Sequence, residues 1–118
     1  MPIKVLVVDD SAFMRAYLRK VLESQPDFEV HAARDGQEAL LRLPELAPDV
    51  VTLDVNMPGM DGLACLRRIM ERFPRPVLMV SSLTQRGAWQ TLEALRLGAV
   101  DYIPKPHSTG ALIDPQWA

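Results

Sequence analysis

The sequence predicts an α/β protein in which helices cover both faces of a parallel sheet. Short apolar runs alternate along the chain with amphipathic segments of helical period. The runs are apolar at consecutive positions, which is typical of strands that are buried on both faces. Alternation of strand and helix favours a doubly wound sheet with right-handed crossovers. With 118 residues, the chain has room for one such domain.

Five segments have the character of strands. Residues 5–8, 50–53, 77–80 and 100–103 are short and mostly apolar, with valine frequent among them. Residues 28–33 form a weaker candidate, because apolar and polar side chains alternate there. We therefore expect five strands in a single sheet.

Four helices are predicted between these strands from apolar residues that recur at helical spacing. Their apolar stripes are Phe13, Tyr17, Leu18, Val21 and Leu22; residues 36–43; Leu63, Leu66, Ile69, Met70 and Phe73; and Ala88, Leu92 and Leu95. Arg15 is expected on the opposite, polar side of the first helix. The second helix should end at Pro44 or Pro48, because proline interrupts helical hydrogen bonding, and the fourth should end at Gly98.

Composition and charge argue against several classes of function. Thirteen basic and fifteen acidic residues give a formal charge of −2, so binding to nucleic acid or to an anionic membrane surface is not expected. The single cysteine, Cys65, allows no internal disulfide, and its apolar neighbours indicate a structural residue on a helix face. No signal peptide and no run of roughly 20 apolar residues stands out, so a cytoplasmic protein is expected.

Polar side chains follow four of the five predicted strands. Asp9 and Asp10 follow the first, Asp54 ends the third, Ser81 and Ser82 end the fourth, and Lys105 follows the fifth. Ligands of doubly wound sheets bind beyond the carboxyl ends of the strands, so these groups should meet at one edge. Each has a simpler explanation alone: the acidic pair could cap a helix, and Lys105 could be a solvated charge. Their common placement at four strand ends favours a shared site.

The three carboxylates predict a cation site at this edge. Clustered carboxylates resist ionising together unless a cation compensates their charge. Mg²⁺ prefers oxygen ligands, and the side chains of Asp9, Asp10 and Asp54 can supply them. The backbone carbonyl of Asn56 could provide a further oxygen.

A bound Mg²⁺ would give Asp54 a chemical use, because a carboxylate can attack phosphorus and form an aspartyl phosphate. Lys105 would add positive charge beside the transferring group, and Ser81 could donate a hydrogen bond to a phosphoryl oxygen. Two rival functions stay open at this point. A small phosphatase of the aspartyl-phosphate type would want an acid where Ser11 stands. A flavin or nucleotide binder would want a glycine-rich loop after the first strand.

Four motifs, VLVVDDS, LDVNMPGMDG, VLMVSS and YIPKP, resemble in order the receiver domain of two-component response regulators. The resemblance covers about residues 3–106. It implies a flavodoxin-like sheet in the strand order 2-1-3-4-5 and phosphorylation of Asp54 by a histidine kinase.

The resemblance also implies a role for each matching residue. Asp9, Asp10, Asp54 and the Asn56 carbonyl would bind Mg²⁺, Lys105 would bind the phosphoryl group, Ser81 would follow that group, and Tyr102 would change rotamer with it. The Lys105–Pro106 peptide is expected to be cis, as in the family. We thus expect a switch in which the face formed by the fourth helix and the fifth strand changes its affinity for a partner.

The segment from Pro76 to Pro106 is most similar to the receivers of chemotaxis protein-glutamate methylesterases. This resemblance implies a chemotaxis-type histidine kinase as partner and, in the full-length protein, a C-terminal esterase domain that the receiver inhibits until Asp54 is phosphorylated. The chain contains no Gly-x-Ser-x-Gly motif, so phosphoryl transfer and autodephosphorylation are expected here, without esterase activity. A receiver with another output domain is the alternative.

The end of the chain departs from the receiver pattern. Residues 1–106 are expected to form the receiver domain, and residues 107–118 a tail that is a remnant of the last helix or a linker. The tail contains Gly110 and Pro115, which disfavour a stable helix. We therefore expect the fifth helix of the receiver fold to be truncated or absent.

Overall fold

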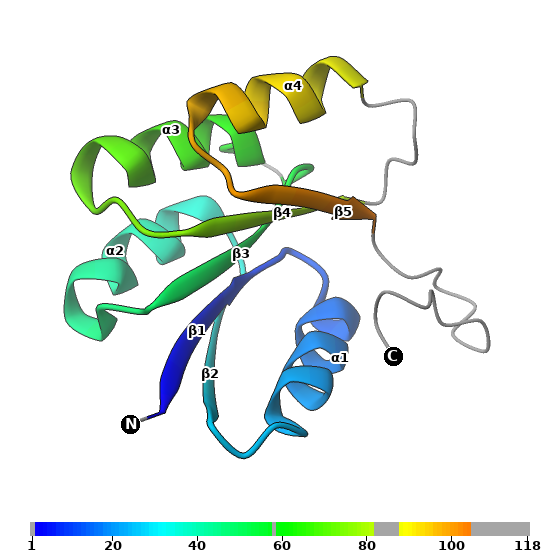
Figure 1. Ribbon diagram of the computed structural model, residues 1–118, viewed down its shortest axis with the longest axis vertical. Coiled ribbons are helices and arrows are strands. Elements are labelled where there is room, and N and C mark those ends of the chain that lie inside the picture. Colours follow the sequence, from blue (N-terminus) through cyan, green and yellow to red (C-terminus); the bar gives the residue numbers. More distant parts are fainter. Residues whose placement is uncertain (1, 58, 82–87, 105–118) are drawn as a thin grey trace.

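The computed structural model describes residues 2–57, 59–81 and 88–104, except for the side chains of 81 and 88–91. Over these residues the chain forms five strands and four helices in strict alternation (Figure 1). Their bounds are β1 Ile3–Val8, α1 Ala12–Glu23, β2 Phe28–Ala33, α2 Gly36–Leu46, β3 Val50–Asp54, α3 Gly62–Arg72, β4 Val77–Ser81, α4 Ala88–Leu97 and β5 Asp101–Pro104. Each strand lies within two residues of its predicted position. None of the helices in this described part has the length and apolar character needed to cross a membrane.

The strands form one parallel sheet in the order β2-β1-β3-β4-β5, which confirms the expected topology. The register pairs Val8 of β1 with Leu53 of β3, and Asp54 of β3 with Val80 of β4. The carboxyl ends of the three central strands are therefore level. Any polar residues that follow them must lie close together.

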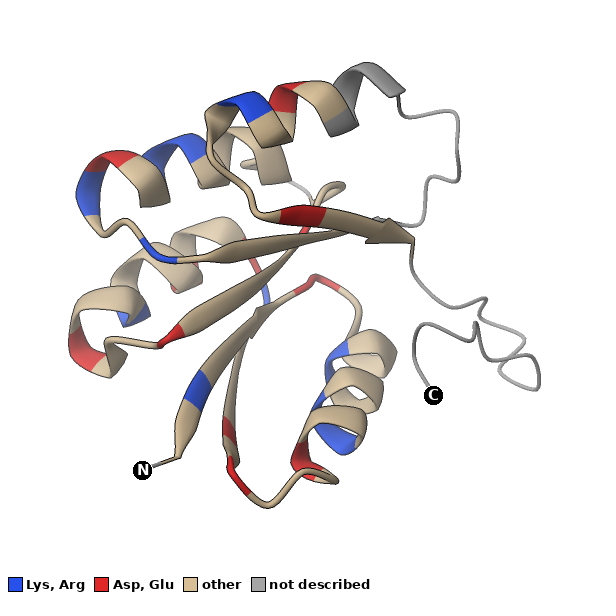
Figure 2. Cartoon of the chain, in the orientation of Figure 1, with Lys and Arg blue, Asp and Glu red and all other residues tan. Residues whose placement is uncertain are grey.

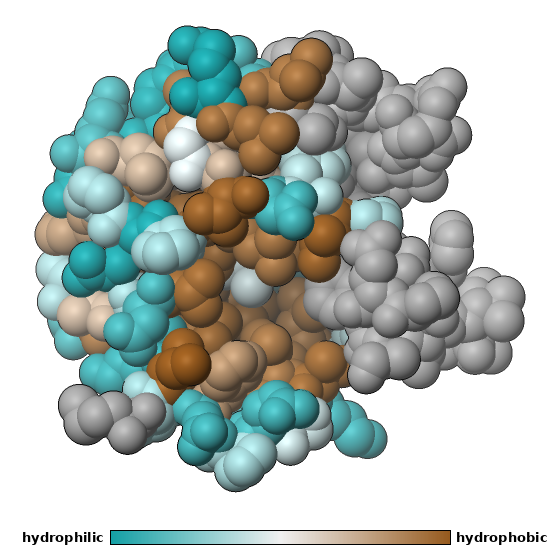
Figure 3. Space-filling view, in the orientation of Figure 1, coloured by the Kyte–Doolittle hydropathy of each residue, from teal (hydrophilic) through white to brown (hydrophobic). Residues whose placement is uncertain are grey.

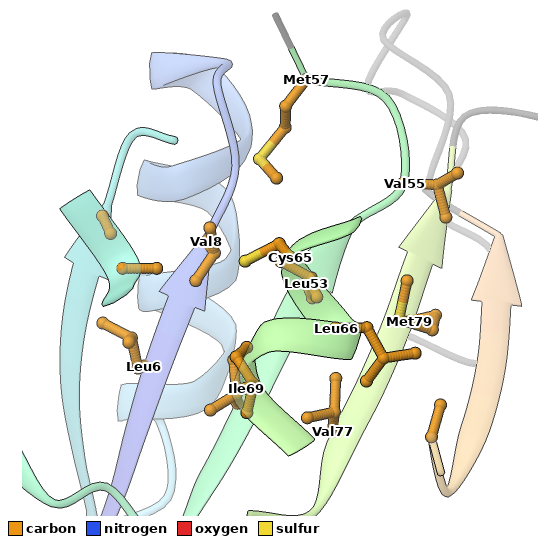
Figure 4. Close-up of a cluster of buried hydrophobic side chains, with 14 of the residues drawn as sticks. Leu6, Val8, Leu53, Val55, Met57, Cys65, Leu66, Ile69, Val77 and Met79 are labelled. Atoms are coloured by element: carbon orange, nitrogen blue, oxygen red, sulfur yellow. The ribbon is translucent and has the colours of Figure 1, made fainter. Parts of the chain in front are cut away.

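Helices cover both faces of the sheet: α2, α3 and α4 lie on one face, and α1 lies on the other (Figure 1). Side chains alternate between the faces along each strand. In β1, Val5 and Val7 pack with Met14 and Leu18 of α1. The larger cluster lies on the opposite face, and its members include Leu6, Val8, Leu53, Cys65, Leu66, Ile69, Val77 and Met79 (Figure 4). The doubly wound prediction is confirmed.

The second helix continues past the first of its two predicted end points. Helix α2 continues through Pro44 to Leu46, so the expectation for Pro44 was wrong. Pro44 is exposed and lies in the last turn, where a missing backbone donor costs one helical hydrogen bond. The helix ends instead at Ala47, whose φ of 47° is left-handed and whose N–H donates to the Leu43 carbonyl. Pro48 directly follows this cap, so the second of the two expected end points is confirmed.

The predicted apolar stripe of the fourth helix was also wrong. Leu92 is 68% exposed and Leu95 is 44% exposed, whereas Ala94 is fully buried in the larger cluster. The small side chain at Ala94 faces the core, so the leucines beside it point outward. Val100, which follows the helix, is exposed as well. Figure 3 shows apolar side chains on the surface in the region of α4 and β5.

Cys65 lies in α3 and is fully buried, as expected for a structural residue. Burial raises the pKa of its thiol to about 12, so the group is protonated at neutral pH. At pH 8 the native protein should react very slowly with an aromatic disulfide reagent, and the denatured protein should react at once. The absorbance of the released thiolate measures both rates. Rapid reaction of the native protein would contradict the burial of Cys65.

Candidate phosphoacceptor site

Three of the predicted site residues come together at the carboxyl edge of the sheet. One carboxylate oxygen from each of Asp9, Asp10 and Asp54 lies within 4.8 Å of the other two. Asp9 and Asp10 directly follow β1, and Asp54 is the last residue of the neighbouring strand β3. Asp9 and Asp54 are each 1% exposed, whereas Asp10 is exposed. We call this group the acidic triad. Figure 2 shows acidic residues where the chain leaves β1 for α1.

Backbone hydrogen bonds fix the turn that carries Asp9 and Asp10. The Asp9 N–H donates to the Ala33 carbonyl at 3.1 Å, and Asp9 Oδ1 accepts from the Ser11 N–H at 2.9 Å. Ser11 caps α1, because its hydroxyl oxygen accepts from the Met14 N–H at 3.2 Å. The capping explanation of the acidic pair was therefore wrong. Ser11 also occupies the position at which an aspartyl-phosphate phosphatase would want its acid.

The chain after β3 places Asp54 against the start of α3. Asp54 Oδ1 accepts from the backbone N–H of Asn56 at 3.3 Å. The Gly62 N–H donates to the Val55 carbonyl at 2.7 Å, which brings the first turn of α3 onto the end of the strand. A Cβ at Gly62 would lie 2.2 Å from the Asp54 carbonyl oxygen, so this approach requires glycine. Asp61 caps α3 through the Ala64 N–H at 2.8 Å.

The donor set of the acidic triad fits a hard cation. Three carboxylates so close together repel one another, and a divalent cation would compensate them. Oxygen donors of this kind suit Mg²⁺. In the described part of the chain, no histidine or cysteine belongs to the group, and His31 is bonded to Glu29 on β2 at 2.6 Å. The residues therefore suit magnesium better than zinc.

The structure describes some of the predicted site residues only in part or not at all. Lys105, the Lys105–Pro106 peptide and the tail 107–118 lie outside the described residues. The backbone of Ser81 ends β4 opposite Pro104, one residue beyond the partner of Asp54, but its side chain is not described. Asn56 is exposed, and its backbone N–H donates to the Asp54 carboxylate.

Tyr102 lies on β5 beside Met79 and packs against the larger cluster. Its hydroxyl is buried and has no hydrogen-bond partner among the described residues.

Two residues that support the triad were not predicted as part of the site. Arg15 was expected on the polar side of α1, yet its Nη1 donates to the Asp9 carbonyl at 2.8 Å. Gly62 is the last residue of the LDVNMPGMDG motif and was given no role of its own. Glycine permits backbone-to-backbone contact, but the Asp61-Gly62 pair does not reveal which element would approach it.

Comparisons with known proteins agree with this geometry. The sequence model of the response regulator receiver domain family matches residues 5–115 of the chain. A protein-glutamate methylesterase/protein-glutamine glutaminase of Rhodospirillum rubrum is 62% identical over 109 residues, which are 92% of this chain and 30% of that protein. The chain thus spans about a third of the length of this relative.

Solved structures agree as well. The response regulator domain of Thermotoga maritima CheB matches with a TM-score of 0.85 and 51% identity, over 99% of this chain and 86% of that one. A chain of the CheX–CheY–BeF3–Mg²⁺ complex from Borrelia burgdorferi matches with a TM-score of 0.82 and 37% identity, over 92% of this chain and 81% of that one. The sheet order, the match over most of the chain and these likenesses together show that the chain belongs to the response regulator receiver domain family.

Proposed function

We propose that the acidic triad binds Mg²⁺ and that Asp54 accepts a phosphoryl group from a histidine kinase. The convergence of three carboxylates within 4.8 Å, with Asp54 buried at the end of a central strand, carries the proposal. The B. burgdorferi complex, whose name includes Mg²⁺ and a fluoride of beryllium, supports it by similarity. The proposed ligands are the carboxylates of Asp9, Asp10 and Asp54 and the carbonyl of Asn56.

In the proposed reaction, an oxygen of Asp54 forms a bond to phosphorus while the bond from phosphorus to the imidazole nitrogen of the donor breaks. A proton goes to the leaving imidazole, so charge and atoms balance. When bound, Mg²⁺ supplies positive charge for the oxygens of the transferring group. The buried position of Asp54 excludes water from most sides of its carboxylate. Lys105 is the proposed second source of positive charge.

The proposed response runs toward α4 and β5. Ser81 at the end of β4 would move to the phosphoryl group, and Tyr102, which packs against the larger cluster, would follow it. Leu92 and Leu95 of α4, and Val100 before β5, expose apolar side chains that would be available to a partner.

For the full-length protein, we propose that phosphorylation relieves inhibition of a C-terminal protein-glutamate methylesterase domain. The likeness to the methylesterase of R. rubrum and to the CheB response regulator domain supports this output. The substrates would be glutamyl methyl esters on chemoreceptors, and the phosphoryl donor a chemotaxis-type histidine kinase. Transfer from an ATP-dependent kinase would place the protein in the cytoplasm. A receiver with a different output domain is the competing possibility.

Chemical phosphorylation tests the phosphoacceptor proposal directly. With acetyl phosphate and Mg²⁺, the intact mass of the protein should increase by one phosphoryl group, and EDTA should prevent the increase. Hydroxylamine should remove the group, because it cleaves acyl phosphates and leaves phosphate esters of hydroxyl side chains intact. The absence of an adduct, or an adduct that resists hydroxylamine, would overturn the proposal.

A further inference from the structure

Arg15 connects helix α1 to both ends of the turn that follows β1. Its side-chain Nη1 donates to the Asp9 carbonyl at 2.8 Å, across six positions of the sequence. Its backbone N–H donates to the Ser11 carbonyl at 2.9 Å, as the first hydrogen bond of the helix. Arg15 is half-buried, unlike the exposed Arg19 one turn further along α1.

The Asp9 carbonyl is part of the peptide unit that joins Asp9 to Asp10. A peptide unit is planar, so the direction of this carbonyl also sets the direction of the Asp10 N–H. The other side of Asp9 is already fixed, because its N–H is bonded to Ala33 and its Oδ1 to Ser11. The bond from Arg15 adds a restraint on the peptide unit between the two acidic residues.

We infer that Arg15 is a positioning residue for cation binding, since its bond to the Asp9 carbonyl orients Asp9 and Asp10 so that their carboxylates meet that of Asp54. The inference rests on the proposed function, because it assigns Arg15 a role at the proposed Mg²⁺ site. It does not make Arg15 a ligand: a guanidinium has no acceptor with which to bind a cation.

Positioning and charge predict opposite effects of removing Arg15. A positive charge beside a cation site repels the cation. If charge were the only effect, removing the guanidinium would therefore strengthen Mg²⁺ binding. Loss of the bond to the Asp9 carbonyl would instead release the Asp9–Asp10 peptide and weaken binding. Partners that orient metal ligands typically change metal affinity by about 10- to 100-fold when removed. The sign of the change therefore identifies the mechanism.

The test is isothermal titration calorimetry of MgCl₂ into the wild-type chain and into Arg15→Met, Arg15→Lys and Arg19→Met. Arg15→Met should raise the Kd for Mg²⁺ about tenfold. Arg15→Lys retains a donor and the charge, so it should bind Mg²⁺ more tightly than Arg15→Met. Arg19→Met removes the same charge from the same helix and should bind as the wild type does. Thermal unfolding by circular dichroism checks that each variant is folded.

A second readout needs no metal. In amide NMR spectra of the metal-free protein, Arg15→Met should shift or broaden the signals of Asp10 and Ser11, and Arg19→Met should leave them unchanged. Equal or tighter Mg²⁺ binding by Arg15→Met overturns the inference, even where the wild type binds Mg²⁺ and is phosphorylated. A wild type that binds no Mg²⁺ overturns the proposed function and this inference together. The two failures are thus distinguishable.

Discussion

Replacing Asp54 with asparagine is expected to abolish the Mg²⁺-dependent phosphoryl adduct and to stabilise the metal-free protein. The amide is not a nucleophile of the same kind, so the hydroxylamine-sensitive adduct should be absent from intact mass spectra. The substitution also removes one of three charges whose ligand atoms lie within 4.8 Å of one another. Two unit charges about 4 Å apart interact by about 1 kcal/mol in water and about 4 kcal/mol near a protein surface. Urea unfolding in EDTA should show a gain within this range.

The matched control for this prediction is Asp9→Asn. It removes one charge from the same triad and leaves Asp54 in place, and an amide oxygen can still accept from the Ser11 N–H. Asp9→Asn should therefore also be more stable in EDTA. Its phosphorylation should be slow and largely independent of Mg²⁺, with any adduct still on Asp54. A hydroxylamine-sensitive adduct on Asp54→Asn would assign the acceptor role to a different carboxylate.

Gly62→Ala is expected to be the most damaging substitution of a single methyl group near the site. The new Cβ would lie 2.2 Å from the Asp54 carbonyl oxygen and 2.6 Å from the Val55 Cα. Both atoms belong to the backbone, so no change of rotamer relieves the clash. Overpacking of this kind costs up to about 3 kcal/mol and occasionally more. Urea unfolding should report that loss, and the folded fraction should accept phosphate more slowly because Asp54 is displaced.

Gly59→Ala separates this steric effect from backbone strain. Gly59 has a φ of 81°, and a Cβ there would meet no atom within 4 Å. Gly59→Ala should lower the free energy of unfolding only by the strain of a left-handed alanine, about 1–2 kcal/mol. A loss at Gly62 no greater than that at Gly59 would show that α3 can move away from β3 without penalty.

Much of the fold could be predicted because strand and helix alternate in a simple way along the chain. Buried strands of a parallel sheet are apolar at consecutive positions, as in β1 and β3, and this pattern is local. The strand order was implied by family resemblance, because periodicity does not report which strands pair. The orientation of α4 could not be predicted. The small residue Ala94 faces the core while the more hydrophobic Leu92 and Leu95 face outward, which is the reverse of what side-chain hydrophobicity indicates.

The carboxylates of the site could be predicted because Asp9 and Asp10 follow the first strand and Asp54 ends the third. The sheet then brings Asp9 and Asp54 together through the pairing of β1 with β3. The supporting contacts could not be predicted in the same way. Arg15 reaches a backbone carbonyl, and every residue has one, so no residue pattern marks the contact. The need for glycine at Gly62 depends on where α3 meets β3, which is a property of the assembled fold.

The contact of Gly62 with β3 has a mechanical consequence. Backbone touches backbone there, and the Gly62 N–H is bonded to the Val55 carbonyl at 2.7 Å. The three atoms nearest to a Cβ at Gly62 all belong to the backbone of Asp54 and Val55, so no side chain cushions the contact at this point. We therefore expect a shift of the Asp54 main chain to move the first turn of α3 as well. Leu66 and Ile69 of that helix pack in the larger cluster, so the shift would also displace side chains of the core. The end of β3 and the start of α3 are thus expected to move together, because they are joined at a residue without a side chain.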